Sequence, residues 1–136
     1  TEDIIQLPEG LLGFSRCTRF VVLEDPAQAP FMWLQSLDNT DLGFVVVDPL
    51  TIVPDYQIQV PREEVEELEL EDPRQARIFV MVVVPEDLKD VSANLKGPIV
   101  VNPNNRLGKQ LVLMDDRYPT QYFFMRENSQ SSGNSS

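Results

Sequence analysis

Eleven prolines divide this 136-residue chain into short runs that are rich in β-branched and aromatic residues. The gaps between the runs hold turn sequences such as PEG, DNTD, NPNNRLG and DDRYP. No helix-period pattern of apolar residues extends over more than about two turns. The spacing therefore predicts an all-β fold, a compact β-barrel or sandwich of about eight or nine short strands with one or two short helices.

Two of the predicted strands carry further information. In YQIQV, Tyr56, Ile58 and Val60 share one face, and the two glutamines share the other. The run VMVVV is apolar on both faces, which suits a central strand. The full set of predicted strands covers residues 3–7, 19–23, 31–37, 42–48, 56–60, 77–84, 98–102 and 109–114, with 121–125 as a further candidate.

The segment PREEVEELELE, residues 61–71, holds six glutamates. Pro61 suits the first turn of a helix, and Glu63 and Glu64 would face the positive end of the helix dipole. Val65 and Leu68 could then dock on the barrel, and Asp72-Pro73 would stop the helix. A strand through the alternating Leu68 and Leu70 is the alternative. We expect a short acidic helix.

The charge balance limits the partners. Eleven Lys and Arg against 22 Asp and Glu give a formal net charge of −11. This charge repels phosphate backbones and anionic membrane surfaces and favours basic proteins. The basic cluster of Arg106 and Lys109 is too small for a nucleic-acid footprint. We therefore expect no direct nucleic-acid or membrane binding.

The single cysteine and the short apolar runs indicate the compartment and the domain organisation. Cys17 is the only cysteine, which fits a reducing cytoplasm, and no apolar run approaches the roughly 20 residues of a membrane span. No signal peptide is visible in the sequence given. We expect one cytoplasmic domain over residues 1–126, monomeric on its own, followed by a disordered polar tail at 127–136.

Little in the sequence points to catalysis. The chain has no histidine and no phosphate- or dinucleotide-binding motif, so we expect no metal, no cofactor and no enzyme activity. Without a histidine partner, Cys17 is expected to be a buried or incidental thiol. The carboxylate pairs Asp115-Asp116 and Glu86-Asp87 could do acid–base work, but each lies where a turn needs such residues.

Three segments resemble the flagellar assembly factor FliW family: LPEGLLGF (7–14), FMWLQSLDNTDLGFVVVDP (31–49) and VPEDLKDVSANLKGPIVVNPNNRLGKQLVL (84–113). Their order and spacing also match, and the likeness spans residues 4 to about 118. Two departures stand out. Leu12 occupies a position where the family commonly has proline. The family also implies a strand ahead of residue 3, of which this chain holds only part.

The resemblance implies a non-enzymatic protein with two partners. One is flagellin, held in the cytoplasm through its terminal helical region before export. The other is CsrA, an RNA-binding translational regulator, whose repression of flagellin mRNA is relieved while FliW occupies it. An export chaperone or general interaction module with no role in translation remains the alternative.

Candidate partner contacts follow. The acidic segment suits a basic CsrA-like protein, although it could equally be a solvated helix; its glutamates are Glu63, Glu64, Glu66, Glu67, Glu69 and Glu71. Asn102 and Asn105, with Arg106, either contact a partner or only build a turn between strands. Phe31, Trp33, Phe44 and Val46 are expected in the core, while an exposed member could anchor a flagellin helix.

Overall fold

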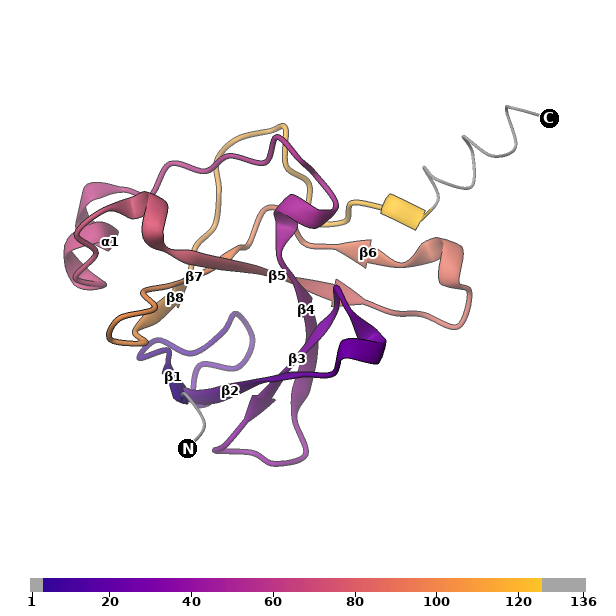
Figure 1. The fold of residues 1–136 in the computed structure, drawn as a ribbon, viewed down its shortest axis with the longest axis horizontal. Helices are drawn as coiled ribbons and strands as arrows, with labels where there is room; N and C mark the ends of the chain where they lie inside the picture. The colour runs from indigo at the N-terminus through magenta and orange to yellow at the C-terminus, as the bar shows by residue number, and fades with distance from the viewer. Residues whose placement is uncertain (1–3, 126–136) are drawn as a thin grey trace.

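The computed structural model describes residues 4–125, and its eight strands form one antiparallel sheet that curls into a nearly closed barrel (Figure 1). The sheet order is β1-β2-β3-β4-β5-β7-β8, and β6 also pairs with β5. The all-β prediction is confirmed, as a barrel. The strands are β1 (Ile4–Gln6), β2 (Arg19–Glu24), β3 (Met32–Ser36), β4 (Gly43–Val47), β5 (Arg77–Val83), β6 (Ser92–Ala93), β7 (Ile99–Val101) and β8 (Gly108–Gln110).

The described residues contain one α-helix longer than a turn, α1 (Arg62–Glu67). Four 3-10 turns complete the secondary structure: Pro26–Gln28, Pro49–Thr51, Pro73–Gln75 and Leu88–Asp90. In each, an aspartate just before the turn accepts a hydrogen bond from a backbone N–H two residues on. The Asp-Pro pairs of the sequence therefore start turns at three places.

The barrel closes where β1 meets the start of β8. Gln6 and Leu107 form a parallel bridge, and the Gln6 N–H donates to the Arg106 carbonyl at 2.9 Å. Gly108 follows, and a Cβ there would lie 2.7 Å from a methyl group of Leu7. Glycine lets the two edges approach, because no larger residue fits between them.

The molecule has an inner core and two outer ones. The barrel interior holds Ile5, Leu7, Leu11, Phe20, Leu34, Val46, Phe79, Ile99 and Val101. On the outside of β4, β5 and β6, Val47, Val80 and Val82 pack under Tyr56, Tyr118 and Phe124. Outside β7 and β8, Val100 and Leu111 pack under α1 and the residues after it. Since side chains alternate along a strand, both faces of β5 are apolar, as predicted for a central strand.

The predicted strand at 56–60 is wrong, although its alternation is right. Tyr56 is buried, and Ile58 and Val60 are half-buried, whereas Gln57 and Gln59 are exposed. The segment is held by side chains instead of a ladder: the Tyr56 hydroxyl donates to the Leu95 carbonyl at 2.7 Å, and the Tyr118 hydroxyl accepts from the Gln57 N–H at 2.9 Å. Burial raises the pKa of the Tyr56 hydroxyl, so it remains a donor.

Several other strands differ from their predictions. The segment 121–125 contributes a single bridge, Ala93–Tyr122, and is not a strand. Its partner β6 was not predicted, because a two-residue strand leaves no periodic signal. The predicted strand 109–114 is regular only to Gln110. The predicted tail at 127–136 lies outside the described residues.

Candidate functional site

The acidic segment forms α1, as predicted. Pro61 precedes the first helical residue with a φ of −56°, and Glu63 and Glu64 lie in the first turn. Val65 is half-buried and Leu68 is buried, and both contact the outer core of Val100 and Leu111. The alternative strand through Leu68 and Leu70 does not form. The helix is therefore fixed to the outside of β7 and β8 by its apolar side chains.

The helix ends earlier than predicted, and a different residue ends it. Glu69 has a φ of 57°, the left-handed conformation in which glycine is the usual residue. Its N–H donates to the Glu66 carbonyl, and the Leu70 N–H donates to the Val65 carbonyl. This pair of hydrogen bonds is a Schellman motif. Asp72-Pro73, predicted as the stop, instead begins a separate 3-10 turn.

Three carboxylates converge on one amine beside α1. The Lys109 ammonium contacts Glu64 at 2.8 Å, Glu9 at 3.1 Å and Glu67 at 3.3 Å. The hydrogen bond to Glu64, with those to Glu9 and Glu67, raises the pKa of Lys109 above its usual range, although partial burial opposes the shift. The side chains of Lys109 and Glu64 are only 20% and 15% exposed. Through these ion pairs, Lys109 of β8 connects α1 to the turn after β1 that contains Glu9.

The other four glutamates of the segment face solvent. Glu63, Glu66, Glu69 and Glu71 are all exposed, and no Lys or Arg of residues 4–125 forms an ion pair with them. Glu64 and Glu67 instead form ion pairs with Lys109. The outward-facing charge of the predicted acidic surface is therefore carried by these four side chains.

Asn102 lies inside the molecule. Only 4% of it is exposed, and its amide nitrogen donates to the carbonyls of Leu68 and Glu69 at 2.9 and 3.1 Å. The Asn105 amide donates to the Leu68 carbonyl at 3.2 Å. Both asparagines thus satisfy carbonyls that the end of α1 leaves unpaired. Partner contact at Asn102 would need this burial to be undone, whereas Asn105 is exposed and Arg106 half-buried.

A wide apolar groove of about 560 Å³ lies at the C-terminal end of β5, where Val84 follows the strand. Its floor is a row of outward-facing side chains on three neighbouring strands, because Leu23 pairs with Trp33 and Trp33 pairs with Val45. The groove borders the first outer core, to which Val91 belongs and against which Phe31 and Val45 pack. Its remaining lining is Asp25, Gln28, Phe31, Met32, Val84, Leu88, Val91 and Met125.

The expectation that Phe31, Trp33, Phe44 and Val46 are core residues holds fully only for Val46. Trp33 is 40% exposed, and Phe31 and Phe44 are half-buried. Trp33 faces outward because Leu34, the next residue, fills the barrel interior. Sequence reasoning missed that Leu23 and Val84 are exposed. Only the strand register shows that Leu23 and the half-buried Val45 lie on either side of Trp33. An apolar Leu88 inside the turn sequence PEDLKD was an available signal.

The Trp33 indole is held in place. A Cβ on Gly43 of β4 would overlap the indole ring, so glycine makes room for it. The indole N–H donates to the Gln35 side-chain oxygen at 2.9 Å. The Gln35 amide nitrogen in turn donates to the carbonyls of Ser36, Thr40 and Leu42. The ring is thus an exposed apolar surface with a fixed orientation.

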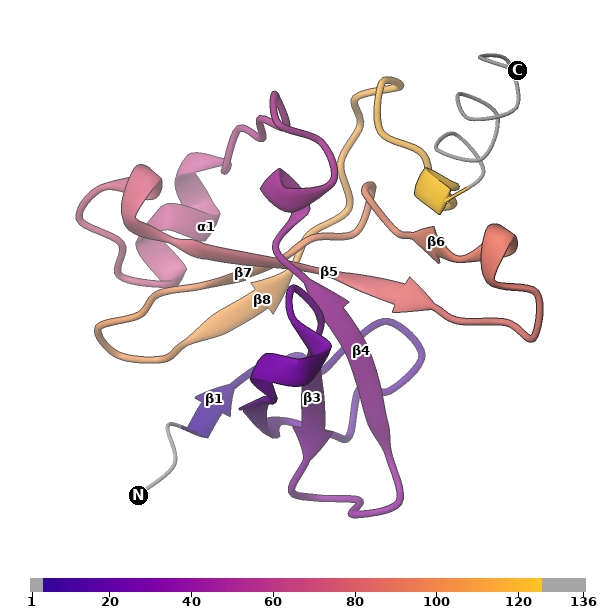
Figure 2. The ribbon, with the colours of Figure 1, turned by 45° about the vertical axis from the view of Figure 1, so that its right-hand side comes forward.

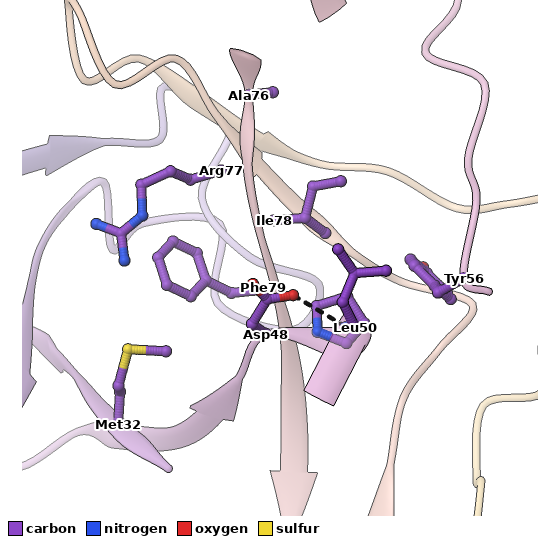
Figure 3. A pocket seen from close by; sticks show the side chains of 9 residues that line it. Met32, Asp48, Leu50, Tyr56, Ala76, Arg77, Ile78 and Phe79 are labelled. Atoms are coloured by element: carbon purple, nitrogen blue, oxygen red, sulfur yellow. Dashed lines mark hydrogen bonds between the residues drawn. The ribbon is translucent and has the colours of Figure 1, made fainter. Parts of the chain in front are cut away.

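A smaller pocket of about 210 Å³ lies where β4 leaves β5 (Figure 3). The β4–β5 ladder ends at the pair Val47–Val80, and the register would place Asp48 opposite Phe79 and Pro49 opposite Ile78. Proline has no N–H to donate, so the ladder cannot continue. Asp48 accepts from the Leu50 N–H at 2.9 Å, and the Arg77 guanidinium lies over the Phe79 ring at 4.8 Å. The pocket is a consequence of this turn.

One aspartate of each candidate acid–base pair stabilises a turn. Asp87 accepts from the Lys89 N–H at 3.2 Å, and Asp115 accepts from the Arg117 N–H at 2.9 Å. The hydrogen bonds from Arg117 lower the pKa of Asp115.

Cys17 is half-buried against the inner core. Within residues 4–125, His, Cys, Asp and Glu side chains nowhere gather in a group of three that could hold a metal ion. In the same part of the chain, no helix is long and apolar enough to cross a membrane.

Comparison with known proteins gives one consistent family. The model of the family described as "FliW protein" matches residues 1–124. The chain is 41% identical over 122 residues to the flagellar assembly factor FliW of Caldicellulosiruptor saccharolyticus, covering 90% of this chain and 80% of that protein. It is 43% identical over 122 residues to the same factor of Natranaerobius thermophilus, covering 89% and 81%. A crystal structure of the flagellar assembly factor FliW superposes with a TM-score of 0.83 at 34% identity, covering 90% of this chain and 85% of that one.

Proposed function

Because the chain belongs to the FliW family, we propose that it is a non-enzymatic flagellar assembly factor with two alternative partners. In this proposal it binds flagellin in the cytoplasm. When free of flagellin, it binds a CsrA-like translational regulator and relieves the repression of flagellin mRNA. Secretion of flagellin would then release the protein to the regulator.

The observation that supports this proposal is the presence of two exposed surfaces of opposite chemistry. The acidic helix α1 lies beside the start of β5, and the apolar groove adjoins its end, where Val84 follows the strand. In both views of the ribbon, α1 and the connection between β5 and β6 lie at opposite ends of β5 (Figures 1 and 2). Two partners that differ in chemistry can therefore be recognised by one small domain.

We assign flagellin to the apolar groove and the regulator to the acidic surface. A terminal helix of flagellin would bury an amphipathic face against Leu23, Trp33 and Val45. A basic RNA-binding protein would be attracted by the exposed glutamates on and after α1. The Asn105 amide contacts the Leu68 carbonyl at the end of α1, and Arg106 is the next residue, so both could extend that surface. A bound protein of charge −11 would also oppose the approach of RNA within about 8 Å, the screening length at physiological salt.

The test uses purified flagellin and the purified CsrA-like protein of the same host, each titrated with this protein. We expect binding to both, release of the regulator when flagellin is added, and no binding of RNA by the protein alone. Raising salt from about 50 to 500 mM should weaken the regulator complex far more than the flagellin complex. Binding of flagellin alone would support an export chaperone, and binding of neither would refute the proposal.

A further inference from the structure

Exposed apolar side chains gather around Trp33 and enclose a groove of about 560 Å³. Five of its lining residues are large apolar side chains that are exposed: Leu23, Trp33, Val84, Leu88 and Met125. Contiguous apolar surface of this kind costs solubility and marks binding sites. Since Trp33 is fixed by Gln35 and fits over Gly43, a ligand would not need to order it on binding.

The backbone at the centre of the groove floor is paired on both sides. Trp33 of β3 pairs with Leu23 on one side and Val45 on the other, and Val45 of β4 pairs with Val82 on its far side. At Trp33 and Val45 the floor therefore offers side chains and no free strand edge. Leu23 lies at the border of the floor, because β1 pairs with β2 only over Arg19–Val21. An extended peptide could join a ladder at this border but not across the floor. A helix satisfies its own backbone and needs only an apolar surface, so it fits this floor best.

The walls of the groove are acidic. Among the described residues that line the groove, Asp25 is the only charged one. The exposed carboxylates of Glu86 and Asp87 lie between the lining residues Val84 and Leu88 in the sequence. The neighbouring Lys89 amine lies 3.6 Å from Asp87 and is therefore already paired. The rim charge therefore favours a cationic occupant and opposes an anionic one.

We propose that the groove binds one face of a cationic amphipathic helix. The apolar stripe of that helix lies on Leu23, Trp33 and Val45, and Lys or Arg residues beside the stripe face the acidic walls. The identification of this helix with a terminal helix of flagellin rests on the proposed function. Its conformation and charge rest on the groove alone.

The experiment uses two synthetic helical peptides that lack tryptophan and share one leucine stripe at helical spacing. One carries lysines beside the stripe and the other carries glutamates. Trp33 is the only tryptophan of the chain, so its fluorescence reports binding directly. We expect a blue shift with the lysine peptide and at least about tenfold weaker binding of the glutamate peptide at low salt. Equal affinities, or no binding of the lysine peptide, would overturn the proposal.

A matched pair of variants separates the groove from general attraction to an acidic protein. Val84→Lys places a charge in the groove, whereas Val112→Lys makes the same change at a valine of similar exposure outside it, 56% against 53%. We expect Val84→Lys to weaken the lysine peptide about thirtyfold, the size of an interface hot spot, and Val112→Lys to have little effect. Equal losses would contradict the proposed site.

Flagellin is titrated against the same variants. If the lysine peptide binds the groove and flagellin does not bind the protein, the proposed function fails and this inference stands. If flagellin binds wild type and Val84→Lys equally and the lysine peptide does not bind, the inference and the assignment of flagellin to the groove both fail, whereas flagellin binding itself stands.

Discussion

The two ends of β5 use their residues in opposite ways. Beside α1, polar groups are drawn inward: Asn102 is 4% exposed, and Lys109 is surrounded by Glu9, Glu64 and Glu67. At the groove, apolar groups are turned outward, with Trp33 40% exposed. Polarity alone would assign the first set to an interface and the second to the core. The comparison teaches that burial, and not residue type, decides which side chains are available to a partner.

The largest expected effect tests the structural role of Asn102. Replacing it with alanine leaves the Glu69 carbonyl and the Asn104 N–H without their partner and removes one of the two donors to the Leu68 carbonyl. We expect a loss of about 2–3 kcal/mol in the free energy of unfolding, measured by urea denaturation. The exposed neighbour Asn104 is the matched control, and its replacement by alanine should cost less than about 0.5 kcal/mol. Similar losses for the two variants would break the comparison.

Lys109 should have the next largest effect. Lys109→Met leaves Glu64 and Glu67 close together with no cation between them, and we expect a loss of about 1–2 kcal/mol at pH 7, reduced by partial exposure. Lys89→Met, which breaks an exposed pair with Asp87, should cost less than about 0.5 kcal/mol.

The pH dependence of this cluster follows from the raised pKa of Lys109. Its stabilisation is fully present below the unfolded pKa of about 10.4 and is lost as pH rises through the higher folded value. The difference in unfolding free energy between wild type and Lys109→Met should therefore stay constant from about pH 7 to 10. A steady decline over that range would contradict the cluster.

A smaller effect of opposite sign is expected at Glu69. Its left-handed backbone costs about 1 kcal/mol for a residue with a Cβ, so Glu69→Gly should stabilise the protein by up to about that amount. Glu69→Ala removes the same charge but keeps the Cβ, and should bring no gain. Thermal unfolding of the two variants separates the backbone effect from the charge effect.

The smallest effect on stability is expected at the four exposed glutamates. Changing Glu63, Glu66, Glu69 and Glu71 to glutamine should alter the free energy of unfolding by less than about 1 kcal/mol. Association with a CsrA-like protein should nevertheless slow markedly at low salt, because rim charges act mainly on the on-rate. Stopped-flow mixing measures that rate, and an unchanged rate would make α1 only a solvated helix.

Much of the fold could be predicted from the sequence, because most strands carry their own apolar runs and turn residues. The failures are local. Residues 56–60 alternate like a strand but are held by tyrosine hydroxyls, and β6 is too short to leave a pattern. The groove could not be predicted, since Leu23, Trp33 and Val45 meet only through the register of three strands. The Lys109 cluster likewise joins Glu9, Glu64 and Lys109, which are far apart in sequence.

The central claim is that two separate surfaces serve two partners. The most direct measurement compares wild type, Val84→Lys and the four-glutamine variant by calorimetric titration with flagellin and with the CsrA-like protein at low salt. The account predicts that Val84→Lys loses flagellin and keeps the regulator, while the four-glutamine variant weakens the regulator and keeps flagellin. Loss of both partners in either variant, with folding intact, would contradict it.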